Sequence, residues 1–266
     1  MPLKHGLAVL LALCLLGAAG CTLGSAGRRG KPAVNSERHL QAIIDIGLVA
    51  IRTGDYARAL QSLQEAERLA PQNADVKHHL GRTYYHIGDP QQAVDYYNQA
   101  LAIDPSKTDV HNNLGIVYLD LKEYDKARAE FQICISDLTY ANGSMSRLNM
   151  GLVEEASGNP EAAVPYYMQI ISQPSQTPAA APAYYRMAFL EYQKGDFQQA
   201  VDYLTAAVRQ NPEYADAYFL LGESYEKLKR EDDAAEAFGR CVVIDPNSIR
   251  GVEAQRRVRD IMKDYN

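Results

Sequence analysis

Apolar and polar positions follow one recurring pattern along most of the chain. In "HLGRTYYHIGDPQQAVDYYNQALAIDP" (79–105), a Leu-Gly pair is followed by a Tyr three residues after the Gly, an Ala twelve residues after it and an aromatic residue four further on. The same spacing recurs in "NLGIVYLDLKEYDKARAEFQICISDLT" (113–139) and in "FLLGESYEKLKREDDAAEAFGRCVVIDP" (219–246). A pattern repeated at a fixed period predicts one structural unit that is used several times.

Six copies of this pattern are in register. The small residue at its start recurs at intervals of 34, 34, 36, 37 and 34 residues, and the paired alanine follows it by twelve residues each time. A 34-residue repeat of this kind resembles the tetratricopeptide repeat (TPR), which is a helix–turn–helix unit. The small residues are Gly47, Gly81, Gly115, Gly151, Ala188 and Gly222, and the alanines are Ala59, Ala93, Ala127, Ala163, Ala200 and Ala234.

The resemblance implies an all-α fold, a right-handed superhelical solenoid of six TPR units followed by a C-terminal capping helix. The capping helix is expected at 249–266, where an apolar face of Val252, Val258, Ile261 and Met262 would cover the last unit. Short insertions fall near 141–143 and at 175–182, and the prolines around the second one predict a looser joint. The six units are expected at 40–73, 74–107, 108–141, 144–177, 181–214 and 215–248.

Each unit carries its own turn and stop signals. Small residues let the two helices of a unit cross closely, and we expect the paired alanines to face them. Lys122 and Lys229 stand where the other turns have Gly, so the turns of units three and six are expected to differ. The glycines that predict left-handed helix caps are Gly54, Gly88, Gly158 and Gly195. The prolines that end second helices are Pro71, Pro105, Pro212 and Pro246.

The N-terminal residues have the layout of a secretory signal. Lys4 precedes an apolar stretch at 6–20, which is too short for a comfortable membrane span, and small residues follow it. The stretch "AAGC" (18–21) resembles the lipobox of bacterial lipoproteins, in which Cys21 would carry lipid. A plain secretory signal and an uncleaved anchor are the alternatives. We therefore expect a signal peptide at 1–20 and a flexible tether at 21–39.

Charge and cysteine positions narrow the choice of partner. The net charge of the chain is −6, and without Lys4, Arg28, Arg29 and Lys31 it is −10, which argues against a nucleic-acid partner. Beyond the signal and its lipid-bearing cysteine, two cysteines remain. They occupy equivalent places in units three and six, where other units have Ala, and three units of separation exceed the reach of a disulfide. We expect Cys134 and Cys241 to be buried free thiols.

No spacing indicates catalysis or metal binding. His78, His79, His86 and His111 cluster in units two and three, but an HExxH pair is absent and Arg82 stands one turn after His78. These histidines are expected to be solvated groups on the face of the helices, with no metal and no cofactor. The tether, six units and cap account for all residues from 21 onwards, so no separate catalytic domain remains. The sequence predicts a protein that is not an enzyme.

The first helix of each TPR unit supplies the inner surface of such a stack, and its exposed positions change from polar to apolar along this chain. This predicts a partner-binding groove for an apolar or amphipathic segment. Burial by superhelical twist, by the cap or by a dimer is the alternative. A carboxylate clamp is disfavoured because Asn112 and Ile116 stand where it needs Lys and Asn. The groove residues are Ile116, Leu119, Leu148, Leu152, Tyr185, Phe189, Tyr192 and Phe219.

The whole chain, with its lipobox, short tether and six TPR units, resembles the type IV pilus pilotin lipoproteins of the PilW/PilF/Tgl type. The likeness is closest at 111–131, 148–167 and 184–204. Some relatives carry a cysteine pair where this chain has Leu119 and Val153, so no disulfide transfers. Of the site residues, the resemblance implies only the lipid-bearing Cys21.

The resemblance also implies a function and a place. The protein would be lipid-anchored to the periplasmic face of the bacterial outer membrane, since Thr22 rather than Asp follows Cys21. Its protein partner would be the subunits of the pilus secretin. The alternative is another envelope scaffold, similar to the TPR lipoproteins that dock peptidoglycan hydrolases or proteases.

Overall fold

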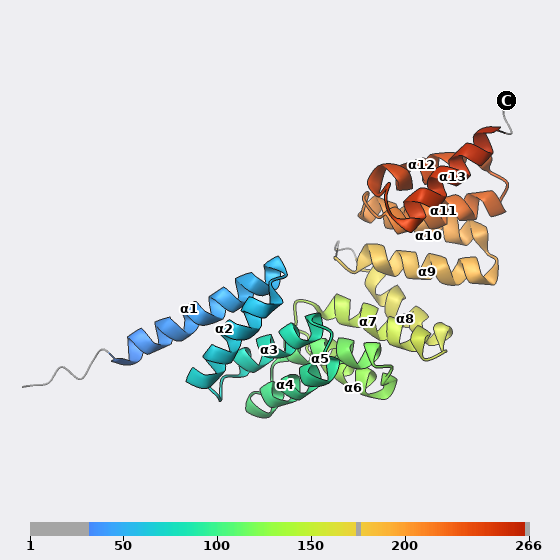
Figure 1. Ribbon diagram of the computed structural model, residues 1–266. Helices are drawn as coiled ribbons and strands as arrows, with labels where there is room; N and C mark the ends of the chain where they lie inside the picture. Colours follow the sequence, from blue (N-terminus) through green and yellow to red (C-terminus); the bar gives the residue numbers. More distant parts are fainter. Residues whose placement is uncertain (1–31, 174–176, 264–266) are drawn as a thin grey trace, which may run out of the picture. The chain divides into compact units, whose positions relative to one another are not determined.

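The computed structural model describes residues 32–173 and 177–263, and within these residues the chain forms thirteen helices and no strand (Figure 1). The predicted signal peptide and Cys21 lie outside the described residues. The predicted all-α fold is confirmed. The helices are α1 (Pro32–Thr53), α2 (Tyr56–Leu69), α3 (Ala74–His86), α4 (Pro90–Ile103), α5 (Thr108–Asp120), α6 (Tyr124–Ser136), α7 (Gly143–Ala156), α8 (Pro160–Ile171), α9 (Ala180–Lys194), α10 (Phe197–Gln210), α11 (Ala215–Lys227), α12 (Glu231–Ile244) and α13 (Ile249–Lys263).

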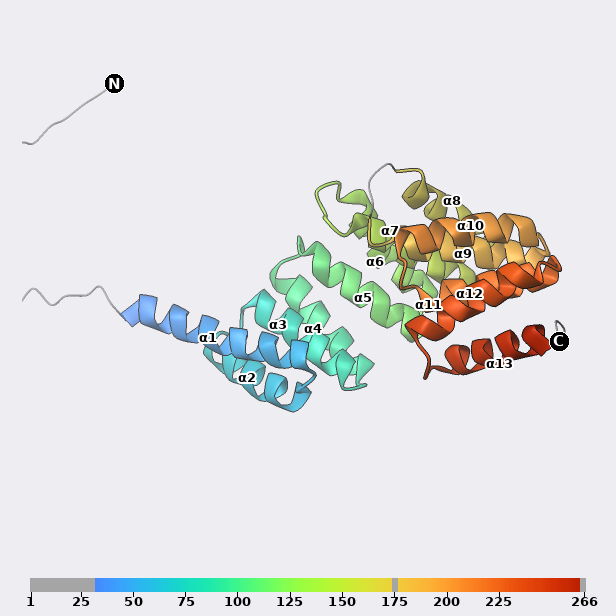
Figure 2. The same cartoon turned by 90° about the horizontal axis from the view of Figure 1, so that it is seen from above.

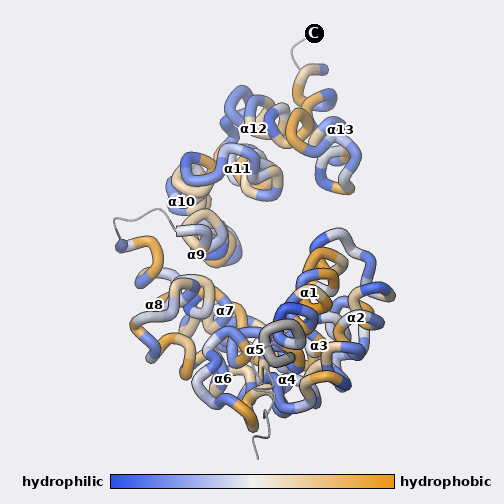
Figure 3. Tube along the Cα trace, turned by 90° about the vertical axis from the view of Figure 1, so that its left-hand side faces the viewer, coloured by the Kyte–Doolittle hydropathy of each residue, from blue (hydrophilic) through white to orange (hydrophobic). Residues whose placement is uncertain are grey.

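The helices from α1 to α12 form six pairs, each joined by a short turn (Figures 1 and 2). From α3 onwards each pair begins within one residue of the range expected for its unit. Residues 40–266 make up one compact unit. Within it α3 contacts α5, α5 contacts α7, and α9 contacts α11. The odd-numbered helices of this unit lie along one side of the stack and the even-numbered helices along the other (Figure 3).

Close crossing of the two helices in a unit depends on a small residue and a large one. A Cβ added to Gly81 would lie 2.6 Å from the Tyr97 ring, and one added to Gly222 would lie 2.7 Å from the Phe238 ring. The paired alanines are buried. In the five units that have glycine, the large side chain four residues after the alanine lies beside the glycine: Leu63, Tyr97, Phe131, Tyr167 or Phe238. That the alanines also face the glycines stays a prediction.

The turns inside the units are more alike than the sequence predicts. Gly54, Gly88, Gly158 and Gly195 have φ values between +76° and +89°, which confirms the predicted left-handed caps. Lys122 and Lys229 also adopt left-handed backbone, with φ of 61° and 58°. In all six turns the amide after the left-handed residue donates to a carbonyl five residues earlier, as in Glu123 N to Tyr118 O. The expectation of different turns in units three and six is wrong, because these hydrogen bonds impose one backbone conformation.

The first helix begins earlier than expected. The tether was expected to extend to residue 39, but α1 begins at Pro32. Proline is tolerated in the first turn of a helix because the amide hydrogens there have no partner within the helix. The last eight residues of the expected tether are therefore helical.

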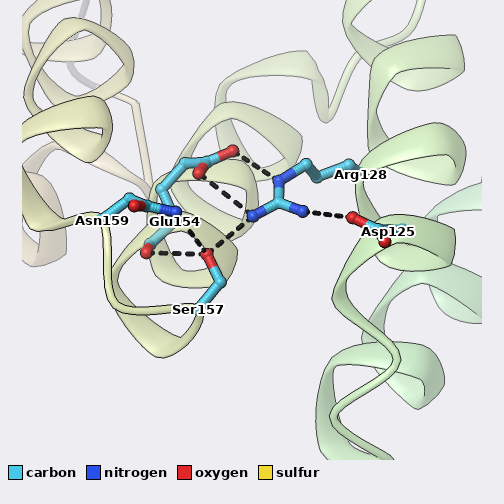
Figure 4. A network of polar contacts seen from close by, with 5 residues as sticks. All are labelled: Asp125, Arg128, Glu154, Ser157 and Asn159. Carbon is cyan, nitrogen blue, oxygen red and sulfur yellow. Dashed lines mark hydrogen bonds and ion pairs between the residues drawn. The ribbon is translucent and has the colours of Figure 1, made fainter.

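Polar contacts fix the register of neighbouring units. The Arg128 guanidinium on α6 donates from Nε to Glu154 Oε1 on α7 at 2.7 Å and from Nη2 to Ser157 Oγ at 2.7 Å (Figure 4). Its Nη1 also donates to Asp125 Oδ1 at 2.7 Å. A planar guanidinium with three acceptors on two units specifies their relative position more closely than apolar packing does.

The C-terminal helix α13 covers the last unit with only part of its predicted apolar face. Ile261 is 7 % exposed and Val258 is half-buried, and both pack against the core of α12. Val252 and Met262 are 57 % and 55 % exposed, so their assignment to the covering face is wrong. Ala254 takes their place in the contact, since it is completely buried.

Candidate protein-binding face

The eight residues expected to form the groove lie on four odd-numbered helices, α5, α7, α9 and α11. Seven of them are half-buried, so each packs against the core and also reaches the surface. These seven side chains are called the inner face below. The inner face consists of Ile116, Leu119, Leu152, Tyr185, Phe189, Tyr192 and Phe219.

The eighth residue, Leu148, belongs to the core. It is 5 % exposed and packs in a cluster with Tyr167 of α8 and Met187 of α9. The following unit therefore covers Leu148, and its assignment as a partner-binding residue is corrected to a packing role.

Aromatic side chains dominate the inner face on α9 and α11. The Tyr185 ring centroid lies 5.3 Å from that of Tyr214, and the Phe219 centroid lies 5.5 Å from that of Phe238. These ring pairs fix the orientation of Tyr185 and Phe219 from behind. The inner face is therefore a preorganised apolar surface, which lowers the entropy lost when a partner binds.

Ion pairs connect the helices around this aromatic surface. Arg186 Nε on α9 donates to Glu155 Oε1 on α7 at 2.9 Å, and the Arg186 guanidinium lies 5.0 Å from the centre of the Phe189 ring. The hydroxyl of Tyr167 also donates to Glu155. This network holds α7 and α9 together on the inner side, across the joint where the sequence carries its proline-rich insertion.

The capping helix adds two arginines that the sequence analysis did not assign to this surface. Arg250 pairs with Asp216 at 2.7 Å and lies 5.8 Å from the Phe219 ring centre, and Arg257 pairs with Glu226 at 2.5 Å. Extending the 34-residue register beyond Asp216 and Glu223 gives positions 250 and 257. The 34-residue register could therefore have identified Arg250 and Arg257 from the sequence.

Glu223 on α11 is a half-buried carboxylate beside the arginines of the cap. Burial raises its pKa above the usual value, and the nearby Arg257 opposes that rise. Among the described residues Glu223 makes no hydrogen bond and no ion pair within 4.0 Å. It is therefore a desolvated acceptor whose hydrogen-bonding capacity remains free.

The odd-numbered helices of units two and three present a polar surface. A cavity of about 610 Å³ lies between α3 and the loops that precede α5 and α7, and it is lined by Arg82, His78, His79, Lys107 and Asn142, among others. The Lys107 ammonium donates to Asp75 at 2.6 Å. The surface that begins as polar in unit two therefore becomes apolar by unit four, as the sequence predicts.

The histidines of this region differ from the solvated groups that the sequence analysis expected. His78 is 8 % exposed, and burial lowers its pKa to about 3. Its Nε2 accepts a 2.7 Å hydrogen bond from the Asn113 amide. Burial also lowers the pKa of His79 to about 4. His111 pairs with Glu130 at 2.6 Å. His86 is exposed, as expected. For His78, His79 and His111 the expectation was wrong, because side chains of other helices cover them.

Both remaining cysteines are buried and free, as predicted. The Cys134 thiol donates to the Thr108 carbonyl at 3.5 Å, and burial raises its pKa to about 11. Burial also raises the pKa of Cys241. These thiols stay protonated at neutral pH and act as small apolar side chains.

Residues 32–173 and 177–263 contain neither a cluster of metal ligands nor a membrane-spanning helix. No group of three or more His, Cys, Asp or Glu side chains there converges on a point that could hold a metal ion. No helix in the same stretch has the length and apolarity needed to cross a bilayer.

Comparison with known families accounts for the repeats. A model of the tetratricopeptide repeat matches residues 44–108 and 185–249, and a second model of the same repeat matches 88–133. Together these matches cover more than half of the chain. The chain belongs to the tetratricopeptide repeat family. Proteins of this TPR family typically act as binding scaffolds.

Solved structures of TPR proteins share the fold of this chain. PilF of Pseudomonas aeruginosa matches with a TM-score of 0.69 at 23 % identity, over 84 % of this chain and 99 % of PilF. PilW, a widely conserved type IV pilus biogenesis factor, matches with a TM-score of 0.69 at 21 % identity, over 81 % and 98 %. YrrB, a TPR protein with an unusual peptide-binding site, gives 0.51 at 19 % identity, over 74 % and 100 %. This chain therefore has a TPR fold of the PilF and PilW type.

Proposed function

We propose that this TPR protein is a lipid-anchored pilotin, an assembly factor for the type IV pilus secretin at the bacterial outer membrane. The inner face would capture a segment of the secretin subunits, and the lipid on Cys21 would deliver them to the membrane. No step of this role needs catalysis, so the protein would act as a scaffold rather than as an enzyme.

The observation that carries this proposal is the extent of the match to PilF and PilW. These two proteins are matched over 99 % and 98 % of their lengths, so the likeness covers their whole stack of units rather than one common repeat. The half-buried aromatic inner face supports it, because soluble proteins rarely leave such a surface without a partner. The lipobox-like "AAGC" supplies a route to the envelope.

Deletion of the gene in its native host tests the function. The proposal expects secretin to accumulate as monomers in membranes of the deletion strain and as multimers when the protein is restored, measured on native gels. Normal secretin multimers in the deletion strain would overturn the pilotin role. A pull-down enriched in a peptidoglycan hydrolase, with no secretin, would favour the envelope-scaffold alternative.

Two substitutions separate anchoring from capture. Cys21→Ala should leave binding of the secretin intact and release the protein from membranes, as measured by fractionation. Phe189→Ala should weaken capture and leave the helical circular dichroism unchanged. Ile133→Ala on α6 is the matched control, because Ile133 is an exposed apolar side chain outside the inner face. Equal binding by the Phe189 and Ile133 variants would show that the inner face is not the binding surface.

A further inference from the structure

In each unit from two to six, one residue directly follows the small residue of the odd-numbered helix. The side chains of these five residues form one row across the stack. Equivalent positions in the repeat place these side chains on the same side of α3, α5, α7, α9 and α11. All five are half-buried. The row has a charged residue at each end and three apolar residues between them: Arg82, Ile116, Leu152, Phe189 and Glu223.

Contacts between helices hold the row together. Asn113 of α5 donates to His78 of α3 at 2.7 Å, and Ser146 of α7 donates to Asn112 of α5 at 3.0 Å. The Arg186–Glu155 pair joins α9 to α7, and α9 contacts α11 directly. These contacts fix the helices relative to one another, and therefore also fix the relative positions of the five side chains of the row.

The positive end of the row has no partner. Within residues 32–173 and 177–263, the Arg82 guanidinium makes no hydrogen bond and no ion pair within 4.0 Å. Three carboxylates line the same cavity as Arg82, but Asp75 is paired with Lys107, and neither Asp109 nor Asp137 lies within 4.0 Å of the Arg82 guanidinium. Arg82 lines the polar cavity of about 610 Å³, so its five N–H donors are accessible to a ligand.

The negative end of the row is equally free. The cations around Glu223 are already engaged, since Arg250 pairs with Asp216 while Arg257 pairs with Glu226 and Glu253. Lys227 is exposed and acts on Glu223 only at a distance. Arg256 is engaged as well, since it pairs with Glu253. Of the four carboxylates at this end of the row, Glu223 is the one that has no ion pair within 4.0 Å among the described residues.

We infer that the row binds a peptide segment with an apolar centre, flanked by an acidic residue that pairs with Arg82 and by a basic residue that pairs with Glu223. This inference rests on the proposed function of the inner face and adds the charge pattern and the polarity of the partner. Paired charges in a half-buried setting add specificity and orientation, because the reversed alignment would bring like charges together.

Selection from a displayed library of random 20-residue peptides on the immobilised full chain tests the inference. The peptides enriched on the wild-type protein should combine an apolar centre with an acidic residue on one flank and a basic residue on the other. Selection on Arg82→Gln should lose the acidic preference alone, and selection on Glu223→Gln should lose the basic preference alone. Arg209→Gln and Glu236→Gln, which change exposed charges on even-numbered helices, are the controls and should change neither.

Affinities of one enriched peptide quantify each pair. The chain contains no Trp, so a Trp in the peptide reports binding by fluorescence without background from the protein. Arg82→Gln should weaken this peptide about five- to tenfold at low salt and should not weaken the peptide whose acidic residue is replaced by Gln. Arg82→Lys and Glu223→Asp keep the charge and should restore most of the affinity. The differences should shrink as salt is raised.

Each outcome decides between the proposals. Two results would overturn the inference about the row and leave the proposed function of the inner face standing. The first is enriched peptides that depend on Phe189 but show no flanking charges, and the second is a charge preference that both variants leave unchanged. No enrichment, or enrichment independent of Phe189, would overturn the proposed function of the inner face as well. A dimer in sedimentation that Phe189→Ala dissociates would show that a second copy covers the row, and would also overturn the inference.

Discussion

The Phe131 ring of α6 occupies the space that a side chain on Gly115 of α5 would need. A Cβ added to Gly115 would lie 2.8 Å from Phe131 Cε1, closer than real carbon atoms approach. Unit five solves the same crossing with Ala188 and Leu204, which are both completely buried. Unit one pairs Gly47 with Leu63, so leucine occurs beside glycine or alanine, whereas a ring occurs only beside glycine. The large residue therefore limits the size of the small one, and the two are called a size-matched pair.

Gly115→Ala should lower the free energy of unfolding by about 1–3 kcal/mol, because the new methyl group overpacks a rigid ring. The higher helix propensity of alanine offsets this loss by only about 1 kcal/mol. Phe131→Leu alone should also destabilise the protein, since it leaves a cavity. Urea unfolding followed by circular dichroism measures each change.

The double variant Gly115→Ala/Phe131→Leu recreates the pair found in unit five. It should be more stable than the sum of the two single changes by about 1 kcal/mol or more, because the smaller side chain leaves room for the methyl group. Strict additivity of the two substitutions would contradict the size-matched pair.

Lys122→Gly should stabilise the protein by about 0.5–1 kcal/mol. Lys122 has φ of 61°, where a side chain is strained and glycine is not, and this gain exceeds the added chain entropy of glycine in the unfolded state. The exposed Lys122 side chain makes no hydrogen bond or ion pair among the described residues, so its loss removes nothing else. The shift of the urea midpoint measures the effect.

Gly88→Ala is the converse test. A Cβ on Gly88 would meet nothing within 4 Å, so any loss of stability comes from the φ of +84° rather than from a clash. We expect a loss of about 1 kcal/mol. An unchanged or higher stability for Gly88→Ala would show that left-handed backbone is not strained in these turns.

The residues that recur in each repeat predict most of the fold. The Leu-Gly pair, the alanine twelve residues later and the prolines at the ends of second helices give the number and type of units. The turns at Lys122 and Lys229 could not be predicted, because local propensity opposes left-handed backbone there and hydrogen bonds from the whole turn override it. The start of α1 at Pro32 was missed because the residues after it lack the repeat pattern.

The candidate site was predictable in outline. Repeat positions grouped eight residues on the odd-numbered helices, and seven of them are half-buried, since equivalent positions share an environment in a repeat protein. That these residues bind a partner stays a prediction. The position of Leu148 in the core and the burial of His78 were not predictable, because they depend on what the next unit places over them. The free Arg82 and Glu223 could not be recognised either, since pairing partners come from other helices.

Gly251→Ala should displace the capping helix. The Asp245 carbonyl oxygen lies 1.9 Å from the position of the added Cβ, and backbone atoms cannot move aside as a flexible side chain does. We expect a loss of about 2 kcal/mol or more, together with loss of the Arg250–Asp216 pair. Gly239→Ala on the neighbouring α12 is the matched control, because its Cβ would meet nothing within 4 Å. That substitution should raise stability by about 0.5–1 kcal/mol.

Stability should fall as the pH falls below about 6.5, in part because His78 and His79 are buried uncharged. Burial lowers their pKa values from 6.5 to about 3 and about 4. Between pH 6.5 and 4 the unfolded chain therefore binds protons that the folded chain does not, and the free energy of unfolding decreases with decreasing pH. Each histidine contributes a slope of up to about 1.4 kcal/mol per pH unit.

Carboxylates titrate in the same range, so the test is a difference between variants. His78→Gln and His79→Gln should each reduce the slope of unfolding free energy against pH between 6 and 4, measured by urea unfolding at a series of pH values. His39→Gln changes an exposed histidine and should leave the slope as it is in the wild-type protein. Equal slopes for all three variants would contradict the neutral burial of His78 and His79.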